Sequence, residues 1–189
     1  MGSARPPLAR QVSHTVISVF GSSRCTEESG LYRLAHQLGE SLALAGFAVA
    51  SGGYGGVMEA VSRGAAEGGG RVIAVVASAI PAKPNRWVQQ EIVVEIWEDR
   101  LHKLIALGEG YVACRGGTGT LVELAVAWEM MNKGLLPRRP LVALGEFWRP
   151  VVELIRSAQE DPRGKDLVCL ADSVPVALEL LQRQLRGKP

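Results

Sequence analysis

Glu123 and the glycine-rich turn before it are the residues of this sequence whose types and spacing best suit chemistry. The segment 110–124 reads Gly-Tyr-Val-Ala-Cys-Arg-Gly-Gly-Thr-Gly-Thr-Leu-Val-Glu-Leu, which predicts a strand, a tight turn and a helix that continues to Met131. Such a turn presents unpaired backbone N–H groups and the positive end of a helix dipole, and both favour an anion. The expected phosphate-binding residues are Gly116, Gly117, Thr118, Gly119 and Thr120.

Two interpretations of Glu123 remain open at this level. Thr120-x-x-Glu123 has the spacing of a capping box, in which the glutamate only satisfies a backbone N–H group. In the other interpretation the carboxylate takes part in chemistry. Its expected place in the first helical turn would favour the ionised form, because the helix dipole is positive there.

Composition restricts the class of protein. The chain has 189 residues, 47% of them hydrophobic, and a net charge of +2 with acids and bases interspersed, so we expect one compact domain over residues 12–187 and no nucleic-acid partner. Three scattered cysteines predict reduced thiols, and the three histidines match no metal-binding spacing. Residues 1–11 are expected to form a loose tail that is neither a signal peptide nor a membrane anchor, which favours a cytoplasmic location without membrane partners.

The elements that must position the turn alternate regularly between strand and helix. This alternation predicts an α/β fold, a doubly wound parallel sheet of about seven strands with helices on both faces. The expected strands are 14–20, 47–50, 71–77, 91–97, 111–114, 141–144 and 167–170. The expected helices are 27–45, 57–66, 98–107, 120–131, 147–158 and 174–185.

Two further turns of small residues follow predicted strands, so they should meet the first turn at one edge of the sheet. They contain Gly21, Ser22 and Ser23, and Gly52, Gly53, Gly55 and Gly56. The glycines of the second turn have an alternative role in tight packing alone. Neither turn has the Gly-x-Gly-x-x-Gly spacing of a dinucleotide site, and a Walker Gly-Lys-Ser/Thr sequence is absent, so no dinucleotide cofactor is expected.

Three motifs together resemble the LONELY GUY (LOG) family, whose older label is possible lysine decarboxylase. They are Ser18-Val19-Phe20-Gly21-Ser22-Ser23, Gly52-Gly53-Tyr54-Gly55-Gly56-Val57-Met58 and Gly116-Gly117-Thr118-Gly119-Thr120-Leu121-Val122-Glu123. The family motif is Pro-Gly-Gly-x-Gly-Thr-x-x-Glu, with an arginine on the preceding helix. Arg100 lies 23 residues before Glu123 (123 − 100), in the family's register. The resemblance covers roughly residues 16–155.

The resemblance implies a Rossmann-like homodimer that acts as a phosphoribohydrolase. Such an enzyme cleaves the N-glycosidic bond of a nucleoside 5′-monophosphate, either a cytokinin riboside monophosphate or AMP, to free base and ribose 5-phosphate. The resemblance makes Arg100 and Glu123 the catalytic pair. From the residues we expect Gly117 to Thr120 to hold the phosphate, the other two turns to complete the pocket, and Met58 to lie near the base or in the core. No cofactor and no metal are expected. Lysine decarboxylation is rejected, because Lys103 and Lys133, the mid-chain candidates for a pyridoxal phosphate lysine, lie in no expected pocket position.

Three residues depart from the family pattern. Arg115 replaces the motif proline, Leu101 replaces a lysine that usually follows the arginine, and Val122 replaces a second acid. An alternative function therefore stays open, a non-catalytic protein that binds a nucleotide or the molybdenum cofactor on the same fold. Arg100 also has an alternative, as a surface cation in the charged helix start Glu98-Asp99-Arg100.

Overall fold

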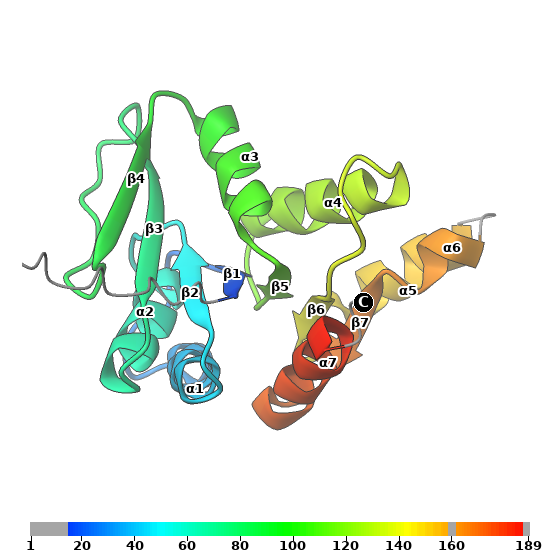
Figure 1. Cartoon of the computed structure of the whole chain (residues 1–189), viewed down its shortest axis with the longest axis horizontal. Coiled ribbons are helices and arrows are strands. Elements are labelled where there is room, and N and C mark those ends of the chain that lie inside the picture. The colour runs from blue at the N-terminus through cyan, green and yellow to red at the C-terminus, as the bar shows by residue number, and fades with distance from the viewer. Residues whose placement is uncertain (1–14, 159–161, 187–189) are drawn as a thin grey trace, which may run out of the picture.

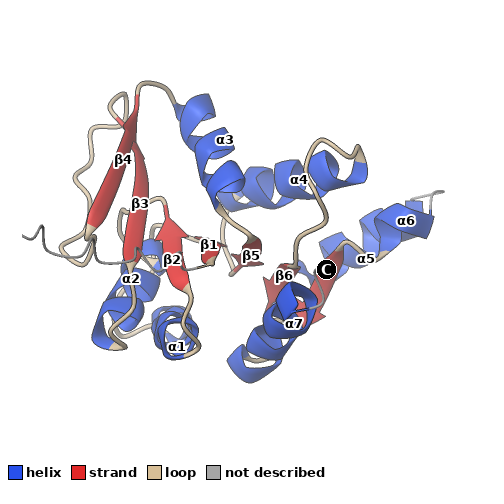
Figure 2. Ribbon diagram, in the orientation of Figure 1, coloured by secondary structure: helices blue, strands red, loops and turns tan. Residues whose placement is uncertain are grey.

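Seven parallel strands form one sheet at the centre of the molecule (Figures 1 and 2). The structure is a computed structural model that describes residues 15–158 and 162–186. The tail expected over residues 1–11 and the first residue of the first expected strand, His14, lie outside the described residues. The strands are β1 (Val16–Phe20), β2 (Ala48–Ser51), β3 (Val72–Ala77), β4 (Gln90–Val94), β5 (Gly110–Ala113), β6 (Leu141–Leu144) and β7 (Val168–Ala171).

Helices cover both faces of this sheet, which confirms the predicted doubly wound α/β fold. They are α1 (Gly30–Leu44), α2 (Val57–Glu67), α3 (Trp97–Leu107), α4 (Thr118–Asn132), the 3₁₀ turn η1 (Glu146–Trp148), α5 (Arg149–Ala158), α6 (Pro162–Lys165) and α7 (Val174–Arg186). In Figure 1, α1, α2 and α7 lie below the sheet, and α3 and α4 lie above it.

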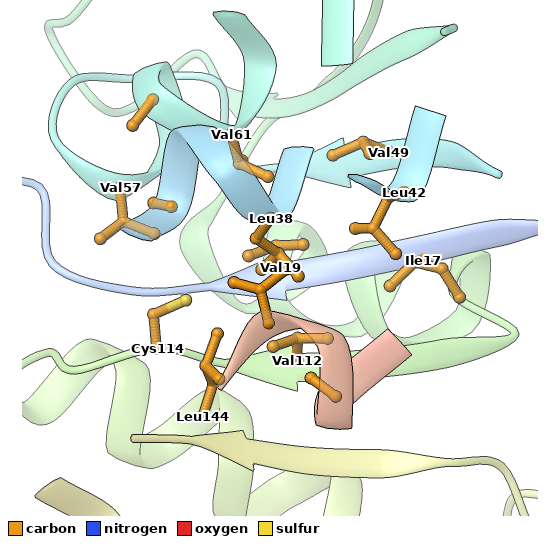
Figure 3. Packing of buried hydrophobic residues seen from close by; sticks show 14 of the residues in the cluster. Ile17, Val19, Leu38, Leu42, Val49, Val57, Val61, Val112, Cys114 and Leu144 are labelled. Carbon is orange, nitrogen blue, oxygen red and sulfur yellow. The ribbon is translucent and has the colours of Figure 1, made fainter. Parts of the chain in front are cut away.

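Two apolar cores, one on each face, hold the layers together. The α1–α2–α7 core packs Leu38, Val61 and Leu181 against strand residues such as Ile17 and Val112, part of which Figure 3 shows. The α3–α4–α5 core packs Leu104, Trp128 and Val152 against the opposite face of the sheet. Strands buried on both faces need apolar side chains at successive positions, which explains the continuous hydrophobic runs of the sequence.

The order of the strands creates a switch point beside β1. The sheet runs β4-β3-β2-β1-β5-β6-β7, so the chain first builds outward from β1 to β4 and then returns to place β5 on the other side of β1. β1 pairs in parallel with both neighbours, with Ser18 opposite Ala50 of β2 and Tyr111 of β5. Ligands bind open α/β sheets beyond the carboxyl ends of the strands at such a point.

Element boundaries differ from the sequence prediction in informative places. α1 begins at Gly30 rather than Glu27, because the Ser29 side chain caps the helix by accepting a hydrogen bond from the Tyr32 N–H group at 3.1 Å. α4 begins at Thr118, two residues before the expected start, with Gly117 as its N-cap. The 3₁₀ turn η1 and the short helix α6 were not predicted.

Candidate functional site

A cavity of about 520 Å³ opens at the carboxyl ends of the strands, around the switch point. The cavity is surrounded by residues of the three turns, of the helices α2, α3 and α4, and of the segment after β3. The lining residues are Gly21, Ser22, Ser23, Arg24, Tyr54, Met58, Ile80, Trp97, Arg100, Gly117, Thr118, Gly119, Thr120 and Glu123. Both members of the predicted catalytic pair therefore share one cavity with residues of all three predicted turns.

Ser22 joins the three turns through its backbone. Its N–H group donates to the carbonyl oxygen of Arg115 at 3.1 Å, and its own carbonyl accepts from the Val57 N–H group at 2.8 Å. Gly56, which precedes Val57, has φ of +66°, and a Cβ there would lie 2.4 Å from the Ser22 oxygen. A side chain at this position would therefore separate the second turn from the first.

The amino end of α4 forms the polar end of the cavity. Gly117 is the N-cap and has no side chain that could bond to the N–H groups of the first turn. Thr118 and Gly119 are exposed, whereas Thr120 is buried at 4% exposure. A 15-residue helix directs the positive end of its dipole at this point. The arrangement suits an anionic group.

Arg100 is a buried cation, not the surface residue of the alternative interpretation. It lies in the first turn of α3 with 6% exposure, and its Nε atom donates to the Val75 carbonyl oxygen at 2.9 Å. Its guanidinium lies 5.4 Å from the centre of the Tyr54 ring, and Nη2 is 3.8 Å from the Met58 sulfur. These contacts fix the planar group at the wall of the cavity.

Gly52 leaves the space that this guanidinium fills. A Cβ at position 52 would lie 1.5 Å from Nη2 of Arg100 and 2.7 Å from the sulfur of Met58. Gly52 is buried and does not line the cavity. The glycine therefore serves the site through Arg100 and not through a ligand.

Glu123 faces the same cavity from α4. Its Oε1 atom lies 3.8 Å from Nη1 of Arg100, and the side chain is 13% exposed. No hydrogen bond to this carboxyl group is present within residues 15–158 and 162–186. Burial raises the pKa of Glu123 to about 7, and the positive charge of Arg100 offsets this only in part.

The structure corrects two expectations for Glu123. The capping-box interpretation is wrong, because Thr120 lies inside α4 and Gly117 is the N-cap. Glu123 belongs to the second turn of the helix, since the first turn holds no acidic residue. The expected preference for the ionised form is also reversed, because loss of water around the carboxyl group outweighs the favourable charges nearby.

The other predicted site residues divide into two groups. The first group lines the cavity: Gly21, Ser22, Ser23, Met58 and the segment Gly117 to Thr120. The second group does not line it: Gly52, Gly53, Gly55, Gly56 and Gly116. Gly53 and Gly56 have positive φ values of 75° and 66°, so the packing alternative describes these two residues best.

Four lining residues were not identified from the sequence. Arg24 and Tyr54 adjoin or belong to predicted turns, so their positions in the sequence were a usable signal. Ile80 follows β3 and Trp97 begins α3 after β4, and no motif marks either residue. Only the packing of the outer strands beside the switch point brings them to the cavity.

The three departures from the LOG pattern all lie outside the cavity lining. Leu101 is buried in the α3–α4–α5 core, and Val122 packs against it. The Arg115 guanidinium lies 5.2 Å from the centre of the Phe147 ring. These substitutions therefore leave the residues around the cavity unchanged.

The remaining expectations concern metals, lysine and membranes. In the part of the chain that the structure describes, no three His, Cys, Asp or Glu side chains form a group that could hold a metal ion. Lys103 and Lys133 do not line the cavity. None of the described helices combines the length and the apolar character needed to cross a membrane.

Comparisons with known proteins relate the chain to several sets of relatives. It is 28% identical to a cytokinin riboside 5′-monophosphate phosphoribohydrolase of Rhodococcoides fascians over 151 residues, which cover 72% of this chain and 75% of that protein. The molybdenum cofactor binding protein of Rippkaea orientalis superimposes with a TM-score of 0.77 and 26% identity, over 92% of this chain and 99% of the other. The molybdenum cofactor carrier protein of Chlamydomonas reinhardtii gives 0.76 and 25%, with the same coverage.

The LOG resemblance therefore holds as a distant relationship within a wider group that includes proteins of other names. A family model matches residues 14–160, most of the chain. The chain belongs to the family described as LDcluster4, the SLOG cluster4 family.

Proposed function

We propose that this protein hydrolyses the N-glycosidic bond of a purine nucleoside 5′-monophosphate, giving free base and ribose 5-phosphate. One observation carries the proposal: a nearly buried carboxyl group, Glu123, lies 3.8 Å from a buried guanidinium, Arg100, in a cavity that begins at a helix amino end. A glutamate that only capped the helix would require neither a buried arginine beside it nor a position in the cavity.

The lining residues suggest how a nucleotide lies in this cavity. The turns after β1 and β5 are adjacent at the switch point, and they supply Ser22, Ser23 and the amino end of α4 for the 5′-phosphate. Ile80 and Trp97 follow β3 and β4 at the opposite end. The ribose then lies between the two ends, beside Glu123.

Cleavage at this position needs a group that tolerates positive charge on the sugar. The bond between C1′ and the base nitrogen breaks through an oxocarbenium-like transition state, as in other glycosyl hydrolyses. The Glu123 carboxylate stabilises that charge and accepts a proton from the attacking water. The oxygen of that water bonds to C1′ as the bond to the base breaks with its electron pair on the base nitrogen. The proton that Glu123 accepted passes to the departing base, which restores the carboxylate.

The pKa of Glu123 suits this role. A general base works best with a pKa near the working pH, and burial raises that of Glu123 to about 7. Arg100 keeps the carboxylate form accessible in spite of burial, because its fixed positive charge lowers the same pKa. Hydrolysis is therefore expected to decline as the pH falls through 7.

The test measures release of base from AMP and from isopentenyladenosine monophosphate. The wild-type protein should yield base and ribose 5-phosphate in equal amounts, and Glu123→Gln and Arg100→Lys should each lower the rate by about 10²-fold or more. Glu129→Gln is the matched control, because Glu129 lies on the same helix with a side chain that is 57% exposed. Absence of base release from wild-type protein that binds AMP would refute the hydrolase.

A second candidate is a non-catalytic protein that binds a phosphorylated cofactor such as the molybdenum cofactor. The observation that favours it is the similarity, at 26% and 25% identity, to structures named as a binding and a carrier protein for that cofactor. Ser22, Ser23 and the amino end of α4 would hold the phosphate of such a ligand. This candidate predicts tight binding of the cofactor and no release of base from any nucleotide.

A further inference from the structure

Trp97 is a large aromatic side chain that the fold itself does not use. It begins α3, is 39% exposed and lines the cavity. Trp128 and Trp148, by contrast, are 4% and 3% exposed and belong to the α3–α4–α5 core. Among the described residues, Trp97 packs into neither apolar core and makes no ring contact. An indole in this position is available to a ligand.

The surroundings of Trp97 offer flat apolar contact. Ile80, Met58 and the ring of Tyr54 line the cavity with it, and the Tyr54 hydroxyl accepts a hydrogen bond from the Ala77 N–H group at 3.4 Å. These side chains follow or belong to elements on the β2–β3–β4 side of the switch point. The turn between β5 and α4 lies on the other side of the switch point.

Backbone donors of the segment after β3 are already occupied. The N–H groups of Ser78 and Ala79 donate to the carbonyl oxygens of Val94 and Glu95 at 2.9 and 3.1 Å, and that of Ile80 donates to Ala77 at 3.0 Å. The Ser78 hydroxyl also donates to the Glu95 carbonyl. The N–H groups of residues 78–80 are therefore not free to recognise the edge of a base.

We infer that the base of the nucleotide stacks on the indole of Trp97. The side chains around Trp97 contact the flat face of the base and form no hydrogen bond to the substituent at the purine 6-position. The inference rests on the proposed function for the identity of the ligand. It adds a residue that selects the base class and predicts that amino and oxo purines bind alike. A site that hydrogen-bonds such a group would reject the wrong purine by about 10⁴-fold.

The adjacent residue Ile96 separates this role from a protein interface. Ile96 is 48% exposed and does not line the cavity. If the two side chains formed an apolar patch for a second protein, Ile96→Ala and Trp97→Ala would have similar effects. If Trp97 holds a base, only its own substitution weakens nucleotide binding.

The experiment is calorimetric titration with AMP, IMP and ribose 5-phosphate. All variants carry Glu123→Gln, which prevents consumption of the ligand. Adding Trp97→Ala should weaken AMP and IMP binding by roughly tenfold to a hundredfold and leave ribose 5-phosphate unchanged, because loss of one stacked base has about this effect. Trp97→Phe should retain most of the affinity, and it replaces the alanine variant if that protein does not fold. Ile96→Ala should bind as the parent does.

Three results would overturn the inference: equal losses for AMP and ribose 5-phosphate, equal losses in Ile96→Ala, or a preference between AMP and IMP near 10⁴-fold. Other outcomes distinguish failure of the proposed hydrolase from failure of the stacking role. If AMP binds through Trp97 but the wild-type protein releases no base, the hydrolase fails and the stacking role stands. If base is released and Trp97→Ala binds AMP normally, only the stacking role fails. If wild-type protein binds no nucleotide, both fail together.

Discussion

Glu123 combines two demands that oppose each other. A carboxyl group that is to accept a proton near neutral pH must be kept from full solvation, and α4 achieves this by burying the side chain until 13% remains exposed. The native state then carries a carboxylate at a place that disfavours charge. The same residue that suits catalysis should therefore destabilise the fold at high pH.

The stability effect of Glu123→Gln should depend on pH. The native pKa of about 7 lies above the ordinary value of 4.5, so between these values the native state holds a proton that the unfolded state has released. The free energy of unfolding consequently falls as the pH rises through this window, by up to ~3 kcal/mol. Glu123→Gln should stabilise the protein at about pH 8 and have little effect at about pH 5. Chemical denaturation at both pH values measures the difference.

Glu129→Gln again serves as the control, because it makes the same change on the same helix at an exposed side chain. A Glu123→Gln variant that is less stable than wild type at about pH 8 would contradict the raised pKa.

Gly52→Ala should damage the site more than the fold. The new Cβ would overlap Nη2 of Arg100 and crowd the Met58 sulfur, and both atoms belong to flexible side chains that can move away. Base release should fall by about 10²-fold, because a displaced catalytic group costs this much. The pH profile should also move to higher pH, since the cation that lowers the pKa of Glu123 is lost.

Steady-state kinetics as a function of pH, together with thermal unfolding, tests Gly52→Ala. Gly30→Ala is the matched control, because a Cβ at this exposed position would meet no atom within 4 Å. Unchanged kinetics in Gly52→Ala would show that Arg100 does not need its present position.

At the scale of elements, the amino end of α4 should bind anions, and Thr118→Glu tests this with effects of opposite sign. Thr118 is the exposed first residue of α4, where a negative charge stabilises a helix by about 0.3–1 kcal/mol. The same charge should repel a phosphate and weaken ribose 5-phosphate binding by roughly tenfold or more. Thr118→Gln introduces a side chain of the same size as glutamate without the charge, so it should change helix stability and ribose 5-phosphate binding less. Calorimetry measures the binding, and thermal unfolding measures the stability. Loss of stability together with normal binding would contradict the anion site.

The sequence predicted most of these elements because their signals are local. Apolar runs marked the strands other than β4, which was recognised from its Val and Ile content, and the 3.6-residue periodicity marked helices such as α1. The start of α4 was misplaced, because Thr118 and Thr120 are both acceptable near a helix start and the choice depends on how Gly117 packs. The short helix α6 carries no periodic pattern that could be recognised.

At the scale of the whole molecule, the sheet order explains which site residues were predictable. The Arg100/Glu123 pair was identified from spacing in a known motif, and the structure brings these two side chains within 3.8 Å. Ile80 and Trp97 were missed, because only the β4-β3-β2-β1-β5 order carries them to the cavity. The raised pKa of Glu123 was also missed, since it depends on burial, which a motif does not encode.

The homodimer implied by the LOG resemblance stays a prediction about the whole molecule. Light scattering over a range of protein concentrations should give about twice the 20.2 kDa mass of one chain. A mass of one chain at every concentration would contradict it. Repeating the measurement with Ile96→Ala and Trp97→Ala separates effects on assembly from effects on ligand binding.

The backbone link through Ser22 has a consequence for how this fold changes over evolutionary time. Both of its hydrogen bonds use main-chain atoms, so most replacements of the side chain leave them in place. Related proteins can then differ in the side chains that line the cavity while the backbone of the three turns keeps its shape. The chemistry of the cavity can therefore change without a change of fold.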